Sequence, residues 1–366
     1  MGRLEVLAVL QERGIVRGEC RDGRVMGDTR GEANRAPLEP LELPQAGRVR
    51  ARRGWNTVAT ASLACLLLGS AAGPGQASGH GMAPPDQGPA AAATEAGDAQ
   101  VQALISRVEA AAAEVRTRGE ASFADFRRRE GPWFRGDHYI VVLGSNGRSV
   151  VYPPDPNGEG LNYSGFQDLG GKPFGREILA VADSSQGLGW VHYQWRRPNP
   201  QDRRPVWKAT FVERVMAPSG RTYLVLSGLY EPPMVKAFVL DAVDRAALLL
   251  QRDGRAAFAA LRDPLGPFYY QDSYVFVLAA DGTLLLNPGF PAIEGRNVLS
   301  WADPSARSHA AQSLHAVLRD GSAWTTYAWP RPNGSTLLEQ KRTYLKRVQT
   351  PSGDILIVGS GSYSLP

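Results

Sequence analysis

The chain has 366 residues, of which 43% are hydrophobic and 21% are charged, which allows two or three domains with buried cores and excludes wholesale disorder or a polytopic membrane protein. The formal net charge is +5, but the 11 arginines and 8 acidic residues of positions 1–77 carry most of it, and residues 78–366 hold 30 basic and 28 acidic residues. Because that remainder is nearly neutral and lacks a basic cluster interleaved with aromatics, we expect no nucleic-acid partner.

The N-terminal part has the pattern of an export leader. An arginine cluster precedes an apolar run at 57–69, and small residues follow it, which is typical of a secretory signal peptide. We therefore predict a signal peptide at 49–77, cleaved after Ala72 or Ala77, and a periplasmic protein. An uncleaved membrane anchor is the alternative, although about 13 apolar residues are short of the roughly 20 that span a bilayer. Residues 1–48 are interpreted as an over-extended gene start.

A stretch without apolar periodicity follows the leader. Residues 78–97 are rich in Gly, Pro and Ala, so we predict a disordered linker there. Both cysteines, Cys20 and Cys65, precede this stretch. The remaining chain therefore cannot form a disulfide, a cysteine-zinc site or a cysteine nucleophile.

The rest of the chain contains two copies of one unit. Identical or similar residues recur at offsets of 135, then 134, then 133 positions, which requires only two single-residue gaps. Matched pairs include Gly119 and Gly254, Asp137 and Asp272, Tyr139 and Tyr274, Trp190 and Trp324, Tyr193 and Tyr327, Trp195 and Trp329, Lys208 and Lys341, and Tyr230 and Tyr363. We predict two tandem modules, 98–232 and 233–366, with Pro232 and Pro233 at their boundary because proline is tolerated before a helix but not inside it.

Each copy begins with an amphipathic helix and continues as strands. Apolar residues at helical spacing predict helices over about 98–129 and 234–262. Strands are predicted at 139–143, 189–195, 206–215 and 224–230, and at 274–279, 324–329, 340–348 and 355–363. Asn146-Gly147 and Asp281-Gly282 predict tight hairpins. Strands joined by hairpins form antiparallel sheets, so the predicted fold class is α+β, with a long N-terminal helix packed on each sheet.

The ordered set of motifs resembles the Cache sensory domain, a PAS-like module found singly or in tandem in bacterial periplasmic receptors. The second copy carries the fuller set: Gly266-Pro267-Phe268, residues 274–278, Asp281-Gly282-Thr283, Gly295-Arg296-Asn297, Lys341-Arg342-Thr343-Tyr344 and Gly361-Ser362-Tyr363. The first copy departs from it with Ser145-Asn146 at the hairpin and Phe211 in place of Tyr344. The resemblance implies a small-metabolite ligand, often an organic acid or amino acid, held against the sheet. It also implies signalling through a membrane-bound kinase or chemoreceptor, which we expect on a partner because the chain stops at Pro366.

The candidate ligand-binding residues are a lysine and several aromatics in each copy. A lysine ammonium in an aromatic pocket would pair with a ligand carboxylate, and tyrosine hydroxyls would orient that group. Core packing of the aromatics and a lysine that extends from a strand edge are the alternatives. The candidates are Tyr139, Tyr193, Trp195 and Lys208 in the first copy and Tyr274, Phe276, Tyr327, Trp329, Lys341 and Tyr344 in the second. Because its set is fuller, we predict that the second copy is the better binder.

No pattern indicates catalysis or a metal cofactor. The histidines lack metal-ligand spacing, the acidic residues lack the spacing of a calcium loop, and residues 359–362 do not form a strand-to-helix nucleophile elbow. We therefore expect no enzyme activity and no cofactor. An envelope scaffold protein with collapsed pockets is the alternative to a ligand sensor, and an unrecognised hydrolase ranks below both.

Overall fold

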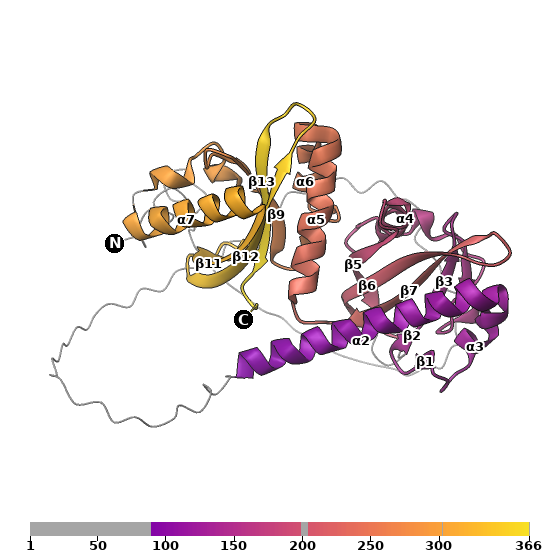
Figure 1. Cartoon of the computed structure of the whole chain (residues 1–366). Coiled ribbons are helices and arrows are strands. Elements are labelled where there is room, and N and C mark those ends of the chain that lie inside the picture. Colours follow the sequence, from indigo (N-terminus) through magenta and orange to yellow (C-terminus); the bar gives the residue numbers. More distant parts are fainter. Residues whose placement is uncertain (1–88, 199–203, 302, 366) are drawn as a thin grey trace, which may run out of the picture. The chain divides into compact units, whose positions relative to one another are not determined.

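A computed structural model of the chain describes residues 89–198, 204–301 and 303–365 (Figure 1). The predicted gene-start extension at 1–48, the predicted signal peptide at 49–77 and most of the predicted linker at 78–97 lie outside these ranges. Among the helices of the described ranges, none combines the length and the apolar character that crossing a membrane requires.

Each module opens with a long helix, as predicted, but neither helix is continuous. Helix α2 (Pro89–Arg118) is followed by the 3-10 turn Gly119–Ser122 and the short helix α3 (Phe123–Arg127). Helix α5 (Lys236–Asp253) is likewise followed by the 3-10 turn Gly254–Ala257 and helix α6 (Phe258–Arg262). The prediction of unbroken helices over 98–129 and 234–262 is therefore wrong. Helix α2 also begins at Pro89, within the predicted linker.

The break lies at the same repeat position in both modules. Gly119 and Gly254 both have a φ of 58°, a backbone conformation that L side chains rarely adopt. The N–H of Gly254 still donates to the carbonyl of Leu250, so the glycine ends the helix as a C-terminal cap. The chain therefore changes direction at a repeated glycine, and a second, shorter helix follows.

The first module contains one antiparallel sheet of five strands in the order β4-β3-β7-β6-β5. Its strands are β3 (Val141–Gly144), β4 (Ser149–Val151), β5 (Leu188–Arg196), β6 (Pro205–Met216) and β7 (Thr222–Tyr230). A separate small ribbon pairs β1 (Phe134–Arg135) with β2 (His138–Tyr139). Helix α4 (Phe174–Asp183), which was not predicted, precedes β5.

The second module has the same strand order, β10-β9-β13-β12-β11. Its strands are β8 (Tyr269–Tyr270), which pairs with β9, then β9 (Ser273–Ala279), β10 (Leu284–Leu286), β11 (Ser322–Pro330), β12 (Leu338–Gln349) and β13 (Ile355–Ser362). Helix α7 (Pro304–Asp320) precedes β11. The repeat in sequence is therefore a repeat in topology, and the predicted α+β fold with antiparallel sheets is confirmed.

The hairpins after β3 and β9 are wider than the predicted two-residue turns. Gly147 and Gly282 have positive φ values of 79° and 87°, whereas Asn146 and Asp281 do not. The amide of Gly147 donates to the carbonyl of Gly144, and that of Gly282 donates to Ala279. This is the arrangement of a three-residue loop that ends in a left-handed glycine. The ladder between β3 and β4 accordingly shifts register after the turn.

Each sheet is covered by helices on both faces. Helix α2 packs on β6 and β7 and α5 packs on β12 and β13, while α4 and α7 pack on the edge strands β5 and β11 (Figure 1). The apolar stripe of α2 is fully buried, and each large aliphatic side chain of that stripe contributes roughly 1.5 to 3 kcal/mol. The sheet face opposite the long helix therefore lies under α4 or α7, and this face carries the candidate ligand residues.

Candidate ligand-binding sites

Alternation along β5 and β6 places the side chains of the first module on two opposite sheet faces. Trp190 packs in the cluster of buried residues that contains the stripe of α2, whereas Tyr193 packs in the cluster on the opposite face with Phe174 of α4. Trp195 adjoins the same cluster as Tyr193. Lys208 is the cross-strand partner of Tyr193, so its side chain emerges on the same face.

The ammonium of Lys208 is buried among phenol groups. Only 4% of this residue is exposed. Its Nζ donates to Oη of Tyr139 over 2.8 Å and to Oη of Tyr230 over 3.2 Å, and the two hydroxyls lie 2.9 Å apart. Nζ also lies 4.7 Å and 4.5 Å from the centroids of these two rings. Lys208 therefore has both hydrogen-bond and cation–π partners.

Burial changes the protonation of this group. Desolvation lowers the pKa of Lys208 to about 7, although the charge of Asp137 opposes the shift. Burial also raises the pKa of Tyr139 and of Tyr230 above the usual range, so both phenols keep their protons. No ion pair of Lys208 occurs in the described part of the chain. Near neutral pH the side chain of Lys208 is therefore partly a charged ammonium and partly a neutral amine, and it has no anionic partner in the described part of the chain.

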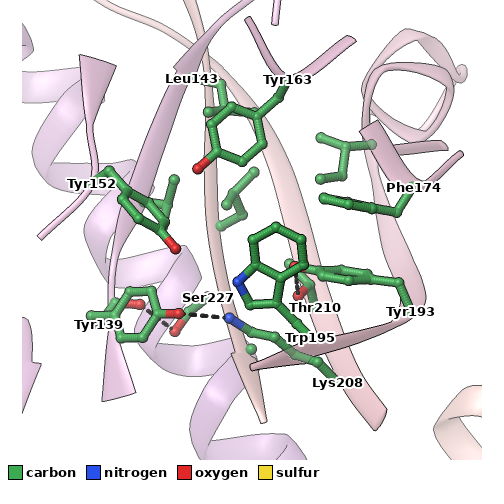
Figure 2. A pocket seen from close by; sticks show the side chains of 14 residues that line it. Tyr139, Leu143, Tyr152, Tyr163, Phe174, Tyr193, Trp195, Lys208, Thr210 and Ser227 are labelled. Carbon is green, nitrogen blue, oxygen red and sulfur yellow. Dashed lines mark hydrogen bonds between the residues drawn. The ribbon is translucent and has the colours of Figure 1, made fainter. Parts of the chain in front are cut away.

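Aromatic side chains surround a small cavity beside Lys208 (Figure 2). In the figure, the ammonium and the hydroxyls of Tyr139, Tyr152 and Tyr163 all point toward the middle of the ring of side chains. Phe174 stacks on Tyr193 with ring centroids 4.2 Å apart. The cavity measures about 20 Å³, enough for a water molecule. A larger ligand would therefore require these side chains to move apart.

All four candidates of the first copy meet at this cavity. Its lining includes Tyr139, Tyr193, Trp195 and Lys208. The cavity is also lined by four residues that no sequence pattern indicated as ligand contacts: Tyr152, Tyr163, Phe174 and Thr210. Tyr152, Tyr163 and Phe174 lie on loops or on the unpredicted helix α4, so strand alternation gave no signal for them.

The second module repeats this arrangement around Lys341, of which 1% is exposed. Its Nζ lies 4.2 Å from the ring centroid of Tyr274 and 5.2 Å from that of Tyr363. Tyr327 is its cross-strand partner, and the hydroxyl of Thr343 bonds to that of Tyr327 at 3.1 Å. Desolvation lowers the pKa of Lys341 to about 7, and Asp272 opposes the shift.

The two lysines differ in their hydrogen bonds. Lys208 donates to two phenols, whereas Lys341 has no hydrogen bond to any residue in the described ranges. The hydroxyl of Tyr363 donates to the carbonyl of Pro330 instead. The ammonium of Lys341 therefore keeps its donor capacity for another group.

Aromatic residues also flank the second lysine. Trp329 stacks near Trp301, with centroids 5.6 Å apart, and meets the edge of Phe290 at the same separation. Phe276 lies two residues after Tyr274 on β9 and shares its face. Five of the six candidates, Tyr274, Phe276, Tyr327, Trp329 and Lys341, therefore share one sheet face.

Tyr344 does not join this group. It packs on Trp324, with ring centroids 5.2 Å apart, and adjoins the core cluster that contains the stripe of α5. It lies three positions after Lys341, and an odd spacing along a strand places two side chains on opposite faces. Phe211, its counterpart in the first module, also lies on the helix side. Tyr344 is therefore a core residue.

An arginine next to each lysine was not predicted. Arg197 pairs with Asp137 at 2.6 Å and with Glu231 at 2.7 Å, and its guanidinium lies 5.3 Å from the ring of Tyr230. Arg331 makes the corresponding contacts with Asp272 and with the ring of Tyr363, and it also pairs with Glu339 of β12, which has no counterpart in the first module. These arginines are related by the repeat offset of 134, which was the signal available in the sequence. The aspartate whose charge acts on each lysine, Asp137 or Asp272, is therefore itself paired with an arginine.

The described ranges contain no candidate metal site. No cluster of three or more His, Cys, Asp or Glu residues there has the arrangement to hold a metal ion. The chemistry that the two sites offer is that of a buried cation, phenol donors and apolar ring faces. This combination suits noncovalent capture of a small anion.

Comparison with known families assigns both modules. The family described as "Single Cache domain 2" matches residues 92–216, and the family described as "Cache domain" matches residues 256–364. No curated protein sequence matches the chain significantly.

Several solved structures are similar to parts of the chain. One described as the periplasmic sensor domain of a chemotaxis protein is 27% identical, with 40% of this chain and 99% of that one covered, at a TM-score of 0.29. A Cache chemosensory domain described for carboxylic acid recognition is 23% identical, with 34% and 90% covered and a TM-score of 0.29. The ligand-binding domain of an amino acid chemoreceptor from Pseudomonas aeruginosa PAO1, in complex with GABA, is 12% identical, with 74% and 93% covered and a TM-score of 0.29.

Proposed function

Because the chain contains two Cache domains in tandem, which are sensory ligand-binding modules, we propose that it is an exported sensor of a small anionic metabolite, an organic acid or an amino acid. It acts in the periplasm without catalysis and reports to a membrane-bound kinase or chemoreceptor. Export is supported by the arginine cluster and apolar run at 48–69.

The proposal of an anionic ligand rests on one observation. A buried lysine occupies the same position in both modules, and neither lysine has an anionic partner among the described residues. Lys208 and Lys341 are 4% and 1% exposed, and neither forms an ion pair in the described residues. A buried charge is costly unless it is paired. A ligand carboxylate would supply the missing partner, and the flanking aromatics would enclose the rest of the ligand.

The second module is proposed as the primary binder. The ammonium of Lys208 is already satisfied by Tyr139 and Tyr230, so a ligand there competes with existing hydrogen bonds. Lys341 has no such bonds to lose. The ligand therefore gains more hydrogen-bond energy at Lys341 than at Lys208.

A scaffold function is the second candidate, and the size of the first cavity favours it. A volume of about 20 Å³ is too small for a metabolite, as expected for a collapsed pocket. In that case the double module would only dock onto other envelope proteins.

A melting-temperature screen of organic acids and amino acids with the full chain separates the two functions. A ligand that binds only the folded protein raises its melting temperature, by an amount that grows with the logarithm of ligand concentration over Kd. We expect at least one acid to do so in wild type and to lose most of that effect in the double variant Lys208→Met, Lys341→Met. Stabilisation by no compound, or stabilisation that the double variant retains in full, contradicts a lysine-centred sensor.

A further inference from the structure

The two modules differ in the polar groups that α4 and α7 present to their binding faces. In the first module, Ile178 and Val181 of α4 pack in one buried cluster with Val191 of β5. All three are at most 3% exposed. The first site is therefore closed on this side by an apolar wall.

The corresponding wall of the second module is a hydrogen-bonded group. Thr325 of β11 stands where the repeat places Val191 in the first module. Its Oγ1 lies 2.7 Å from Nε2 of His309 and 2.7 Å from Oγ of Ser313, both on α7. All three residues are half-buried, so water or a ligand can reach them. We call His309, Ser313 and Thr325 the polar wall.

The polar wall lies on the same face as Lys341. Thr325 and Tyr327 are two residues apart on β11, and Tyr327 is the cross-strand partner of Lys341. The ring of His309 lies 6.4 Å from that of Tyr327. Two residues along a strand correspond to about 7 Å, the span of a ligand a few carbons long.

From this placement we propose that the polar wall determines the specificity of the second module by receiving a second hydrogen-bonding group of the ligand. The ligand is then a short carboxylic acid with a hydroxyl or another carboxylate a few carbons from the first. This inference rests on the proposed function, because Lys341 must hold the first carboxylate.

The reason for discrimination is the cost of an unpaired polar group. A hydroxyl or carboxylate that contacts Ile178 or Val181 gains no hydrogen bond from these two side chains. Against the polar wall it meets two hydroxyls and an imidazole. An apolar ligand end has the opposite preference, since it would cover the polar wall without bonding to it.

The test uses the full chain in a Lys208→Met background, so that titration reports on the second module. The probes are butanoate, 4-hydroxybutanoate and succinate, which share a four-carbon chain and differ at the far end. We expect at least one of the two polar acids to bind about tenfold more tightly than butanoate, as one hydrogen bond allows. Thr325→Val, which keeps the shape of the side chain, and Ser313→Ala should each reduce this preference severalfold.

Thr326→Val is the matched control, because Thr326 is the next residue of β11, is exposed and points to the other face. It should leave the preference unchanged, and the melting temperature of each variant checks its fold. If the acids bind in a Lys341-dependent manner and neither wall variant alters the preference, the inference is overturned while the proposed function stands. If none of the three acids binds, the inference is also overturned. The proposed function is then tested separately by the melting-temperature screen of other organic acids and amino acids.

Discussion

Lys208 and Tyr139 are joined by a hydrogen bond of 2.8 Å inside the first module, although their positions are 69 residues apart in the chain. The bond links β6 to β2 and places an ammonium against a phenol that burial keeps protonated. The hydrogen-bond partners of this lysine are therefore neutral, and the charge of Asp137 offsets only part of the desolvation that lowers its pKa to about 7.

The stability of the fold should reflect the lowered pKa of Lys208. This pKa is about 7 in the folded protein and near 10.5 in the unfolded chain. Between these values the unfolded chain binds a proton that the folded protein does not, so this lysine makes stability rise with pH from about 7 to 10.5. Below pH 7 both states are protonated, and the cost of burying the charge is fully present.

Melting curves of wild type and Lys208→Met between pH 7 and 9.5 check this. We expect the melting temperature of wild type to rise relative to that of the variant across this window. Lys236→Met, at the N-terminal end of α5, serves as the control, because Lys236 is half-buried and outside both sites. Parallel curves for wild type and Lys208→Met would show that Lys208 does not titrate there.

Ligand binding should take up a proton above neutral pH. A carboxylate beside Lys341 favours the charged amine, so an amine that is neutral at pH 8 must gain a proton when the complex forms. Affinity should then fall as pH rises above about 7, by up to tenfold per pH unit. Titration calorimetry at pH 8 in HEPES and in Tris, whose ionisation heats differ, measures the uptake. Equal heats in the two buffers would exclude proton-linked binding.

The repeat predicted that a lysine and several aromatic residues recur at matching positions in the two modules, whereas the register that brings them onto one sheet face comes from the structure. Lys208, Tyr193 and Trp195 share a face for the same reason that Lys341, Tyr327 and Trp329 do. Tyr344 was misplaced although strand alternation, applied from Lys341, assigns it to the opposite face. Tyr344 was a candidate only because it belongs to the run Lys341-Arg342-Thr343-Tyr344, which resembles the family motif.

Other parts of the sites depend on tertiary contacts that a sequence pattern does not specify. Arg197 reaches Asp137 across 60 positions, and only the folded sheet brings them together. Helix α4 is short, and Pro173 at its start gives no side-chain cap, so nothing marks its start, although Phe174, Ile178 and Val181 lie at helical spacing. The breaks at Gly119 and Gly254 fall inside an otherwise helical pattern.

Gly254 should be intolerant of a side chain. Its φ of 58° and ψ of −136° lie in a region that is accessible almost only to glycine. We expect Gly254→Ala to lower the free energy of unfolding by about 1 to 3 kcal/mol, measured by urea denaturation. Gly165→Ala is the control, because a Cβ there meets no atom within 4 Å and its φ is not positive. Equal losses in both variants would mean that backbone conformation is not the cause.

Replacing Lys341 should weaken anion binding more than replacing Lys208. Methionine keeps most of the lysine stem and deletes the charge, and a lost charge-assisted contact of about 1.5 to 3 kcal/mol corresponds to about ten- to a hundredfold in affinity. Lys208→Met should have a smaller effect on the same ligand, because the ammonium of Lys208 is already bonded to Tyr139 and Tyr230. Lys346→Met controls for charge on β12, since Lys346 pairs with Asp244 on the opposite face. Isothermal titration of the three variants with the first anion found in the melting screen decides the order. An unchanged affinity in Lys341→Met would show that this lysine only packs within its strand, and a larger loss in Lys208→Met would reverse the ranking of the modules.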